Sequence, residues 1–299
     1  MLQPHPIIQP FIDYLKFEKR YSGHTILSYQ TDLHSFFDYI VVNYGETPLQ
    51  QVSHIYIRSW LASLKDEKLT SKSINRKIST LKSFFKYQLK TGVIKQTPMS
   101  KISSPKIEKR LPNFVDNKDI KTLFDHVEFP DDWQGKTDRL VLILFYQTGM
   151  RLSELIQLKK TNINISSNSI KVLGKGNKER VIPVSSELLQ LIRQYMTDQK
   201  LQFPEVETDI LLITEKGKCL SPRKVYSSVK KYLSLVTTID KRSPHVLRHT
   251  FATHLTNNGA ELNAVKELLG HSSLAATQVY THNTIEKLKN VYNKAHPKA

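Results

Sequence analysis

Ser-Pro-His-Val-Leu-Arg-His, at positions 243–249, is the stretch from which the architecture of the C-terminal half of the chain can be inferred. Ser243 is a favourable N-cap and Pro244 a favourable first helical residue, so a helix is expected to begin here. Three polar side chains follow at i, i+3 and i+4, a spacing that lets them share one face of the helix. They are His245, Arg248 and His249.

Two glycines divide the residues that follow into further helices. Gly259 is placed to end the first helix and Gly270 to end a second one, because glycine readily adopts the left-handed conformation found at helix C-termini. His271 comes directly after that second end, and the serine pair behind it can cap a third short helix. Tyr280 is expected near the end of this third helix.

The side chains in this region suit an attack on a phosphodiester. An arginine presents a planar fork that matches two non-bridging phosphate oxygens. Histidines donate hydrogen bonds or move protons near neutral pH, and a tyrosine hydroxyl becomes a nucleophile once its proton is taken. A covalent phosphotyrosine intermediate is therefore one interpretation, although a structural role is the commoner one for any of these histidines taken alone.

Taken together and in this order, His245-x-x-Arg248, Gly270-His271 and Tyr280, nine residues later, resemble the C-terminal signature of the tyrosine recombinases, the phage integrase family. HVLRHTFATHL, LLGHSSLAATQVYTH and the last ten residues are similar to the Xer branch. TGMRLSEL resembles the family's first arginine box, with Met150 where leucine is more usual. GKGNKERVIPV is similar to the family's β-hairpin.

The resemblance implies a complete catalytic set: Arg151, Lys175, His245, Arg248, His271 and Tyr280. Tyr280 would attack the scissile phosphate and form a 3′-phosphotyrosyl link, while the two arginines clamp the non-bridging oxygens. Lys175 would protonate the leaving 5′ oxygen. His245 would assist proton transfer at the tyrosine, and His271 would hydrogen-bond the phosphate. A second strand's 5′ hydroxyl can then reverse the attack and reseal the DNA.

Glu154 stands three residues after Arg151, so its carboxylate is placed to orient that guanidinium. A metal site competes with this interpretation, because four histidines lie close in sequence: His245, His249, His254 and His271. No carboxylate in HVLRH matches the zinc-protease pattern HExxH, and two arginines would repel a cation. We therefore expect no metal ion and no other cofactor.

The composition points to a polyanion as partner. The 299 residues suffice for two domains, and 39% of them are hydrophobic, enough to bury cores. The net charge is +17 and the pI about 9.7, which favours nucleic acid; an acidic membrane surface would need an apolar anchor that the sequence lacks. The N-terminus shows no signal-peptide pattern. The single cysteine, Cys219, excludes an internal disulfide, so a cytoplasmic location is expected.

The expected fold is mainly α, in two domains. The resemblance implies that residues 1–102 form a four-helix, SAM-like core-binding domain that grips DNA. It implies that residues 113–299 form a mixed α/β catalytic domain, mostly helical with a small β-sheet. Residues 103–112 would be the linker between them. Helices are predicted at 7–19, 25–42, 54–65, 70–89, 138–147, 185–200, 221–236 and 245–258. Residues 169–174 and 179–184 read as the two strands of a hairpin.

Helix 70–89 has an apolar side and an opposite side with basic residues only. Residues 1–110 carry 17 basic against 8 acidic residues, so the basic side favours contact with the DNA backbone, with a merely solvated face as the alternative. The lysine-rich hairpin tip and the start of helix 221–236 are further candidates. The predicted DNA contacts are Lys72, Arg76, Lys82, Lys86, Lys178, Arg180, Arg223 and Lys224.

A final helix can begin at Asn283, with Glu286 as its capping-box partner. Its apolar residues Ile285, Leu288 and Tyr292 would be short of partners on a terminal helix, and in the family such a helix docks into the neighbouring protomer. The resemblance implies these partners: a double-stranded DNA recombination site, copies of itself or a paralogous recombinase in a tetrameric synapse, and a septal DNA translocase.

The resemblance also implies that the reaction resolves chromosome dimers at cell division. Two alternatives stay open at this point. One is an integrase or transposase of a mobile element that uses the same chemistry. The other is a DNA-binding regulator without catalysis, although binding alone has no need of Tyr280.

Overall fold

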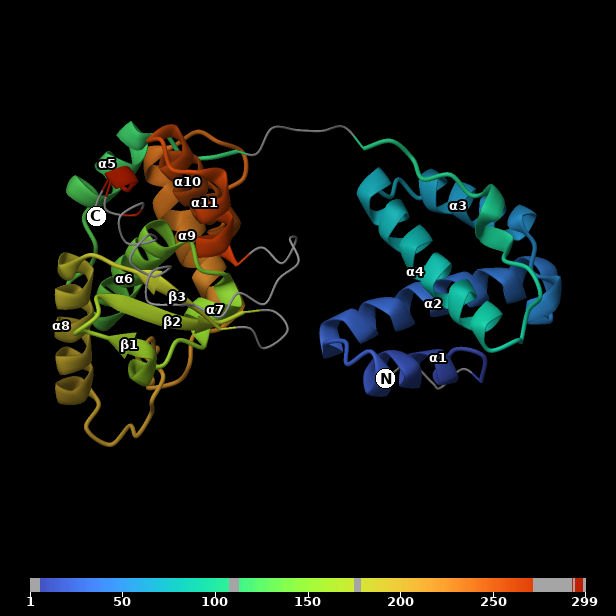
Figure 1. Cartoon of the computed structure of the whole chain (residues 1–299), viewed down its shortest axis with the longest axis horizontal. Coiled ribbons are helices and arrows are strands. Elements are labelled where there is room, and N and C mark those ends of the chain that lie inside the picture. Colours follow the sequence, from blue (N-terminus) through green and yellow to red (C-terminus); the bar gives the residue numbers. More distant parts are fainter. Residues whose placement is uncertain (1–5, 108–112, 175–178, 271–291, 293, 298–299) are drawn as a thin grey trace. The chain divides into compact units, whose positions relative to one another are not determined.

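The computed structural model describes residues 6–107, 113–174, 179–270, 292 and 294–297 (Figure 1). The chain divides into two compact units, Met1–Arg110 and Leu111–Ala299. The division falls inside the stretch 103–112 that the sequence marks as a linker. The expected class, mainly helical with one small sheet, is confirmed. Among the described residues, no helix is both long and apolar enough to span a membrane.

The N-terminal unit is built from four helical segments within residues 6–107, as expected. They are α1 (Gln9–Asp13), continued by a π-helical turn (Tyr14–Glu18), then α2 (Gly23–Tyr44), α3 (His54–Asp66) and α4 (Ser71–Lys90). Three of the starts are fixed by side-chain caps: Ser22, Ser53 and Thr70 each accept a hydrogen bond from a backbone N–H of the first turn.

Aromatic side chains form the centre of this unit. Phe84 of α4 is fully buried and meets Phe11 edge to face, with ring centroids 5.5 Å apart. Phe36 of α2 meets Trp60 of α3 in the same way at 5.1 Å. Such pairs add a preferred geometry to the burial of large apolar surfaces, so they fix how the helices pack.

A buried carboxylate ties α2 to α4. Asp32 of α2 is fully buried and accepts a hydrogen bond from Thr80 Oγ1 at 2.9 Å. Arg76 and Lys77 of α4 both form ion pairs with it. Because an unpaired buried carboxylate is very unfavourable, these contacts fix the rotation of α4 about its axis. The basic side of α4 consequently faces solvent.

The C-terminal unit surrounds helix α6 (Trp133–Thr148), which is buried along most of its length and packs against α8, α9 and α10. The other helices are α5 (Asn117–Asp125), α7 (Leu152–Ile156), α8 (Ser186–Gln202), α9 (Pro222–Val236), α10 (Pro244–Asn257) and α11 (Leu262–Leu269). Helix α6 begins five residues earlier than expected, because Asp132 caps it by accepting from the Gly135 N–H at 2.6 Å.

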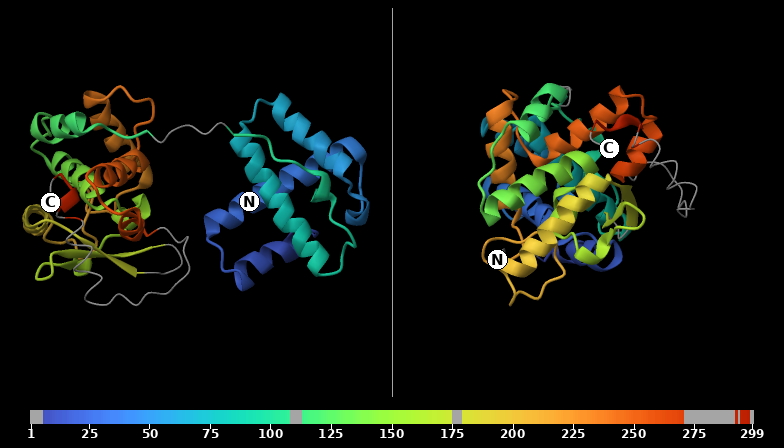
Figure 2. Two further views of the ribbon diagram at one scale, coloured as in Figure 1. Left: turned by 45° about the horizontal axis from the view of Figure 1, so that its top comes forward. Right: turned by 90° about the vertical axis from the view of Figure 1, so that its left-hand side faces the viewer.

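The predicted hairpin is present as β2 (Ser169–Leu173) and β3 (Glu179–Pro183), paired antiparallel with Ile170 opposite Ile182. A short strand, β1 (Ile163–Asn164), pairs with β2 on the other side. Figure 2 shows the strands along one side of the helices of this unit. The end of β3 nearest the hairpin connection lies against α11, which brings the hairpin to the site described below.

The surroundings of Tyr292, near the C-terminus, differ from those expected from the sequence. Tyr292 is fully buried in an apolar cluster with residues of α10 and α11 of its own chain. The Asn258 side chain, just after α10, donates a hydrogen bond to the Ala295 carbonyl at 2.6 Å. The expectation that Tyr292 is short of partners within its chain is therefore wrong. The other two apolar positions of the predicted final helix, Ile285 and Leu288, lie outside the described residues.

Candidate active site

The site is organised around the end of helix α11. Gly270 ends the helix with a φ of 63°, the left-handed conformation that favours glycine. The last carbonyls of a helix have no partner within it and must find donors elsewhere. Here three consecutive carbonyls each accept a hydrogen bond from a different arginine. Arg180 Nε donates to Leu268 O at 2.7 Å, Arg248 Nη2 to Leu269 O at 2.6 Å and Arg151 Nη2 to Gly270 O at 2.7 Å.

The three arginines come from three different elements. Arg151 is the N-cap residue of α7, Arg180 lies on β3, and Arg248 lies on α10. Arg180 and Arg248 are buried, 4% and 7% exposed, whereas the Arg151 side chain is 28% exposed. The structure thus brings the two arginines of the predicted catalytic set, Arg151 and Arg248, to the same helix end.

A single carboxylate connects two of the arginines. Glu154 Oε1 accepts from Arg151 Nη1 at 2.7 Å and from Arg180 Nη1 at 2.8 Å, and Oε2 accepts from Arg180 Nη2 at 2.8 Å and from the Arg151 backbone N–H at 2.7 Å. The structure therefore shows the predicted contact between Glu154 and Arg151. Burial alone would raise the pKa of Glu154, but the hydrogen bonds and charge of Arg180, with the hydrogen bonds from Arg151, lower it to about 2.

Arg248 reaches inward from α10 to the backbone at the end of α6. Its Nη1 donates to the carbonyl of Gly149. Gly149 has a φ of 57°, and a Cβ atom there would lie 2.4 Å from the Phe251 ring, so no larger residue fits. Burial, together with the charges of Arg151 and Arg180, lowers the pKa of Arg248 to about 10. The guanidinium therefore stays protonated at neutral pH.

The histidines of α10 occupy different environments. His245 and His249 are exposed. Burial of part of its ring lowers the pKa of His249, and the charges of His245 and Arg248 lower it further. His254 is buried, and its Nδ1 lies 3.2 Å from the Tyr146 hydroxyl. Its contacts belong to the core rather than to the arginine cluster.

Four predicted residues lie outside the described part of the chain: Lys175, Lys178, His271 and Tyr280. In sequence, the two lysines stand between β2 and β3, and His271 follows Gly270 directly. Within residues 6–107, 113–174, 179–270, 292 and 294–297, no group of three or more His, Cys, Asp or Glu side chains is arranged to hold a metal ion.

The surroundings of Arg180 do not favour the DNA contact expected for it, which stays a prediction. All three nitrogens of its guanidinium donate to protein acceptors, and the side chain is buried. The sequence contains a signal for this, because Arg180 shares its side of the strand with Ile182, which is also buried. The alternation of buried and exposed positions along β3 is hard to recognise in the sequence, because the lysine-rich hairpin tip stands directly before the strand.

The other described candidates for DNA contact are on the surface. Lys72, Lys82 and Lys86 are exposed on α4, and Arg76 is half exposed while its guanidinium bonds Asp32 and Ser28. In the C-terminal unit Arg223 is exposed at the start of α9, and Lys224 forms an ion pair with Glu215 at 2.6 Å. Their contact with DNA stays a prediction.

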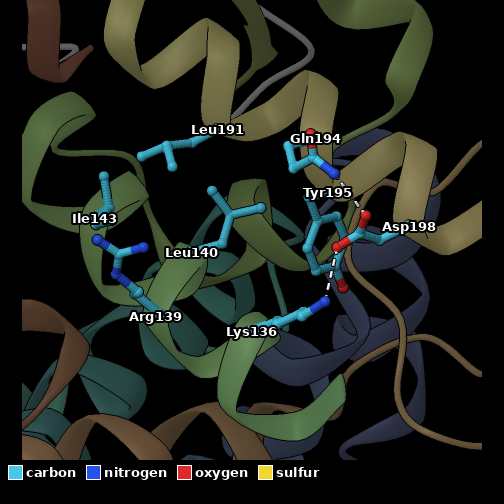
Figure 3. A pocket seen from close by; sticks show the side chains of 8 residues that line it. All are labelled: Lys136, Arg139, Leu140, Ile143, Leu191, Gln194, Tyr195 and Asp198. Atoms are coloured by element: carbon cyan, nitrogen blue, oxygen red, sulfur yellow. Dashed lines mark hydrogen bonds and ion pairs between the residues drawn. The ribbon is translucent and has the colours of Figure 1, made fainter. Parts of the chain in front are cut away.

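A separate pocket of about 360 Å³ opens between α6 and α8 (Figure 3). Leu140, Ile143 and Leu191 supply apolar lining, and Lys136 Nζ meets Asp198 Oδ2 at 2.9 Å. None of the residues predicted for catalysis lines this pocket. We therefore assign the candidate active site to the arginine cluster at the end of α11.

Comparison with known protein families agrees with this architecture. The model of the phage integrase family matches residues 113–287, which contain every residue of the predicted catalytic set. The model of the phage integrase N-terminal SAM-like domain matches residues 8–92. The chain belongs to the phage integrase family. The resemblance inferred from the sequence motifs is thereby confirmed.

Curated relatives that carry the name tyrosine recombinase XerC match nearly the whole chain. The one from Pelotomaculum thermopropionicum is 38% identical over 98% of this chain and 98% of its own length. The one from Listeria innocua is 36% identical over the full length of both. The one from Chlorobaculum parvum is 34% identical over 98% of this chain and 94% of its own.

Two solved structures share the fold at lower identity. The XerH site-specific recombinase, in a post-cleavage complex with palindromic difH substrate, superposes with a TM-score of 0.71 at 20% identity, covering 97% of this chain and 81% of that chain. The Tn1549 transposon integrase, in complex with circular intermediate DNA, gives 0.71 at 18% identity, covering 94% and 98%. Since the two scores are equal, the fold does not separate a Xer recombinase from a mobile-element integrase.

The low pKa of Glu154 makes a prediction about acid stability. A carboxyl group whose folded pKa is about 2, against an ordinary 4.5, contributes stability that is complete above pH 4.5 and is lost as the pH falls toward 2. Glu154→Gln should therefore be less stable than the wild type at pH 7, by about 3 kcal/mol, with the difference shrinking toward zero near pH 2. Urea unfolding at a series of pH values measures this. Glu205→Gln, at an exposed position, is the control, and a pH-independent difference for Glu154→Gln would contradict the assignment.

The exposed lysines of α4 make a prediction about salt dependence. Lys82→Ala combined with Lys86→Ala should weaken binding about equally for the target site and for random duplex, because phosphate contacts carry no sequence information. The slope of log K against log salt should shrink by about 2, since each lost phosphate contact removes roughly one counterion. Lys65→Ala with Lys95→Ala removes the same charge from exposed positions elsewhere in the unit. An unchanged slope in the α4 variant would show that its basic side is only solvated.

Proposed function

We propose that this protein is a site-specific DNA recombinase that cleaves and rejoins DNA strands through a 3′-phosphotyrosyl intermediate. The observation that carries the proposal is the convergence of Arg151 and Arg248, from α7 and α10, on consecutive carbonyls at the end of α11. Tyr280 is ten residues further along the chain from Gly270, at the spacing of the family signature. The relatives named tyrosine recombinase XerC support this assignment.

The geometry suits binding of a phosphate before any chemistry begins. Arg151 and Arg248 are held by backbone carbonyls through some of their N–H groups, while a guanidinium has five donors. The remaining donors can meet the non-bridging oxygens of the scissile phosphate and stabilise the charge that builds in the transition state. Arg151 is the more exposed of the two, so it is the one best placed to meet DNA first.

The reaction balances without an outside energy source. The Tyr280 oxygen forms a bond to phosphorus as the bond to the 5′ oxygen breaks, and we assign to Lys175 the proton that this leaving oxygen takes up. His245 assists removal of the tyrosine proton, and His271 donates to the phosphate. The phosphotyrosyl ester conserves the phosphodiester bond, so a 5′ hydroxyl from another strand can displace the tyrosine and restore DNA.

We place the reaction on a double-stranded recombination site in the cytoplasm. A net charge of +17 supports DNA as the partner, and the single exposed cysteine fits a reducing compartment. The XerC relatives favour a role in resolving chromosome dimers at cell division. We propose a paralogous recombinase and a septal DNA translocase as further partners. Mobile-element integration is the alternative with the same chemistry.

Covalent capture tests the function directly. The wild type, incubated with a nicked suicide substrate, should form a protein–DNA adduct that survives a denaturing gel. Tyr280→Phe lacks only the nucleophilic oxygen, so it should bind the same DNA and form no adduct. Tyr226→Phe, at an exposed tyrosine of α9, serves as the matched control and should react like the wild type. An adduct in Tyr280→Phe, or none in the wild type, would refute the proposed chemistry.

The tetrameric synapse makes a prediction about stoichiometry. Mixing the protein with duplexes that each carry one recombination site should give complexes with two duplexes and four protomers, because exchange needs one nucleophile for each strand cut. Mass photometry with Tyr280→Phe counts the protomers without the complication of cleavage. Complexes that never exceed one duplex, under conditions in which the wild type recombines, would contradict a tetrameric assembly.

A further inference from the structure

Arg180 is the residue of the cluster that the proposed chemistry leaves without a role. Its Nη1 and Nη2 donate to the two oxygens of Glu154, both at 2.8 Å, and its Nε donates to Leu268 O at 2.7 Å. The side chain is 4% exposed. An arginine in this state cannot grip a phosphate without breaking contacts that are costly to lose in a buried site. Its effect must therefore act through the groups that it holds.

The first of these groups is the carboxylate of Glu154. A bidentate arginine fixes the plane of a carboxylate, and here the fixed oxygens also receive Arg151 Nη1 and the Arg151 backbone N–H. Without Arg180, the carboxylate could turn about its last torsion, which is soft, and take Arg151 in a two-pronged pair of its own. That pair would occupy the donors that Arg151 needs for phosphate oxygens. Arg180 thus keeps Glu154 from capturing Arg151.

The second group is the end of α11. Besides the bond to Leu268 O, the Arg180 side chain fills the space next to Gly270. A Cβ atom on Gly270 would lie 3.1 Å from Arg180 Cδ and 3.2 Å from its Nη1. Arg180 also lies on β3, five residues after Lys175 in sequence. One side chain therefore connects the start of β3, next to the hairpin connection, with the carboxylate beside Arg151 and the residue that precedes His271.

We propose that Arg180 is a positioning residue of the recombination reaction, which holds Glu154 in the orientation that leaves the Arg151 fork open to the scissile phosphate. This inference rests on the proposed function. In this role Arg180 acts through Glu154 and Arg151 rather than on the DNA itself, so it is needed for the rate of cleavage and not for the affinity for DNA. A direct DNA contact would instead lower affinity, and a role in stability alone would leave the rate of the folded protein unchanged.

The experiment measures the single-turnover rate of adduct formation on a nicked suicide substrate, with the dissociation constant for the same DNA measured separately. Arg180→Met should form the Tyr280 adduct roughly 10- to 100-fold more slowly, as expected for loss of a residue that orients a catalytic group, with the dissociation constant changed less than about twofold. Arg193→Met, at an exposed position of α8, is the matched control and should react at the wild-type rate.

A second substitution separates positioning from stability. If Arg180 acts by restraining Glu154, then adding Glu154→Gln to Arg180→Met removes the carboxylate that captures Arg151, and the rate should recover in part. A role in stability alone predicts no recovery. Arg180→Lys keeps a buried cation but loses the fork, so it should also be slow at normal affinity, and it provides the test if Arg180→Met does not fold.

The outcomes that overturn the inference are distinct from a failure of the proposed function. If the wild type forms no Tyr280-dependent adduct, the function is wrong and the positioning role falls with it. If the wild type reacts, a wild-type rate in folded Arg180→Met or Arg180→Lys overturns the role of Arg180 alone. If the affinity for DNA falls as much as the rate, Arg180 contacts DNA directly and is not a positioning residue. If the double variant is no faster than Arg180→Met, Arg180 does not act by restraining Glu154.

Discussion

The last turn of α11 is the constraint on which the C-terminal unit depends. Its three terminal carbonyls carry the partial negative charge of a helix C-terminus and have no partners in the helix. Arg151, Arg180 and Arg248 would repel one another if they were buried together without acceptors. The carbonyls need hydrogen-bond donors and the arginines need acceptors. Both needs are met because each carbonyl accepts a hydrogen bond from one arginine. Segments separated by more than a hundred residues, such as α7 and α11, are thereby held in contact.

This arrangement also leaves the cluster with an excess of positive charge. Carbonyl acceptors are neutral, and Glu154 is the only carboxylate bonded to the three arginines in the described part of the chain, so three cations face one anion. The low pKa of Glu154 keeps it ionised at any physiological pH, and the pKa of about 10 keeps Arg248 charged. The excess is therefore fixed by the fold. A phosphate group is an anion that such a preformed site can stabilise without rearrangement.

The elements of the fold could be predicted where local chemistry determines them. Ser221 with Pro222 sets the start of α9, Gly270 sets the end of α11, and alternating β-branched residues define the hairpin. The start of α6 could not be predicted, because in the sequence the capping residue Asp132 is indistinguishable from an aspartate in a loop. Contacts between side chains from distant segments of the chain could not be predicted from the sequence. The contact of Arg180 with Glu154, and the burial of Tyr292, depend on how the elements pack, which no window of sequence contains.

A buried carboxylate that holds two cations occurs in both units. In the N-terminal unit Asp32 pairs with Lys77, whose side chain is 9% exposed, and with Arg76, which is 49% exposed. In the C-terminal unit Glu154 pairs with Arg180, 4% exposed, and with Arg151, 28% exposed. In each case the buried cation offsets the charge of the carboxylate, while the more exposed arginine is oriented by it and keeps its own charge. Positive charge is thus presented at a fixed angle rather than on a freely moving side chain, which reduces the conformational entropy lost when a phosphate binds.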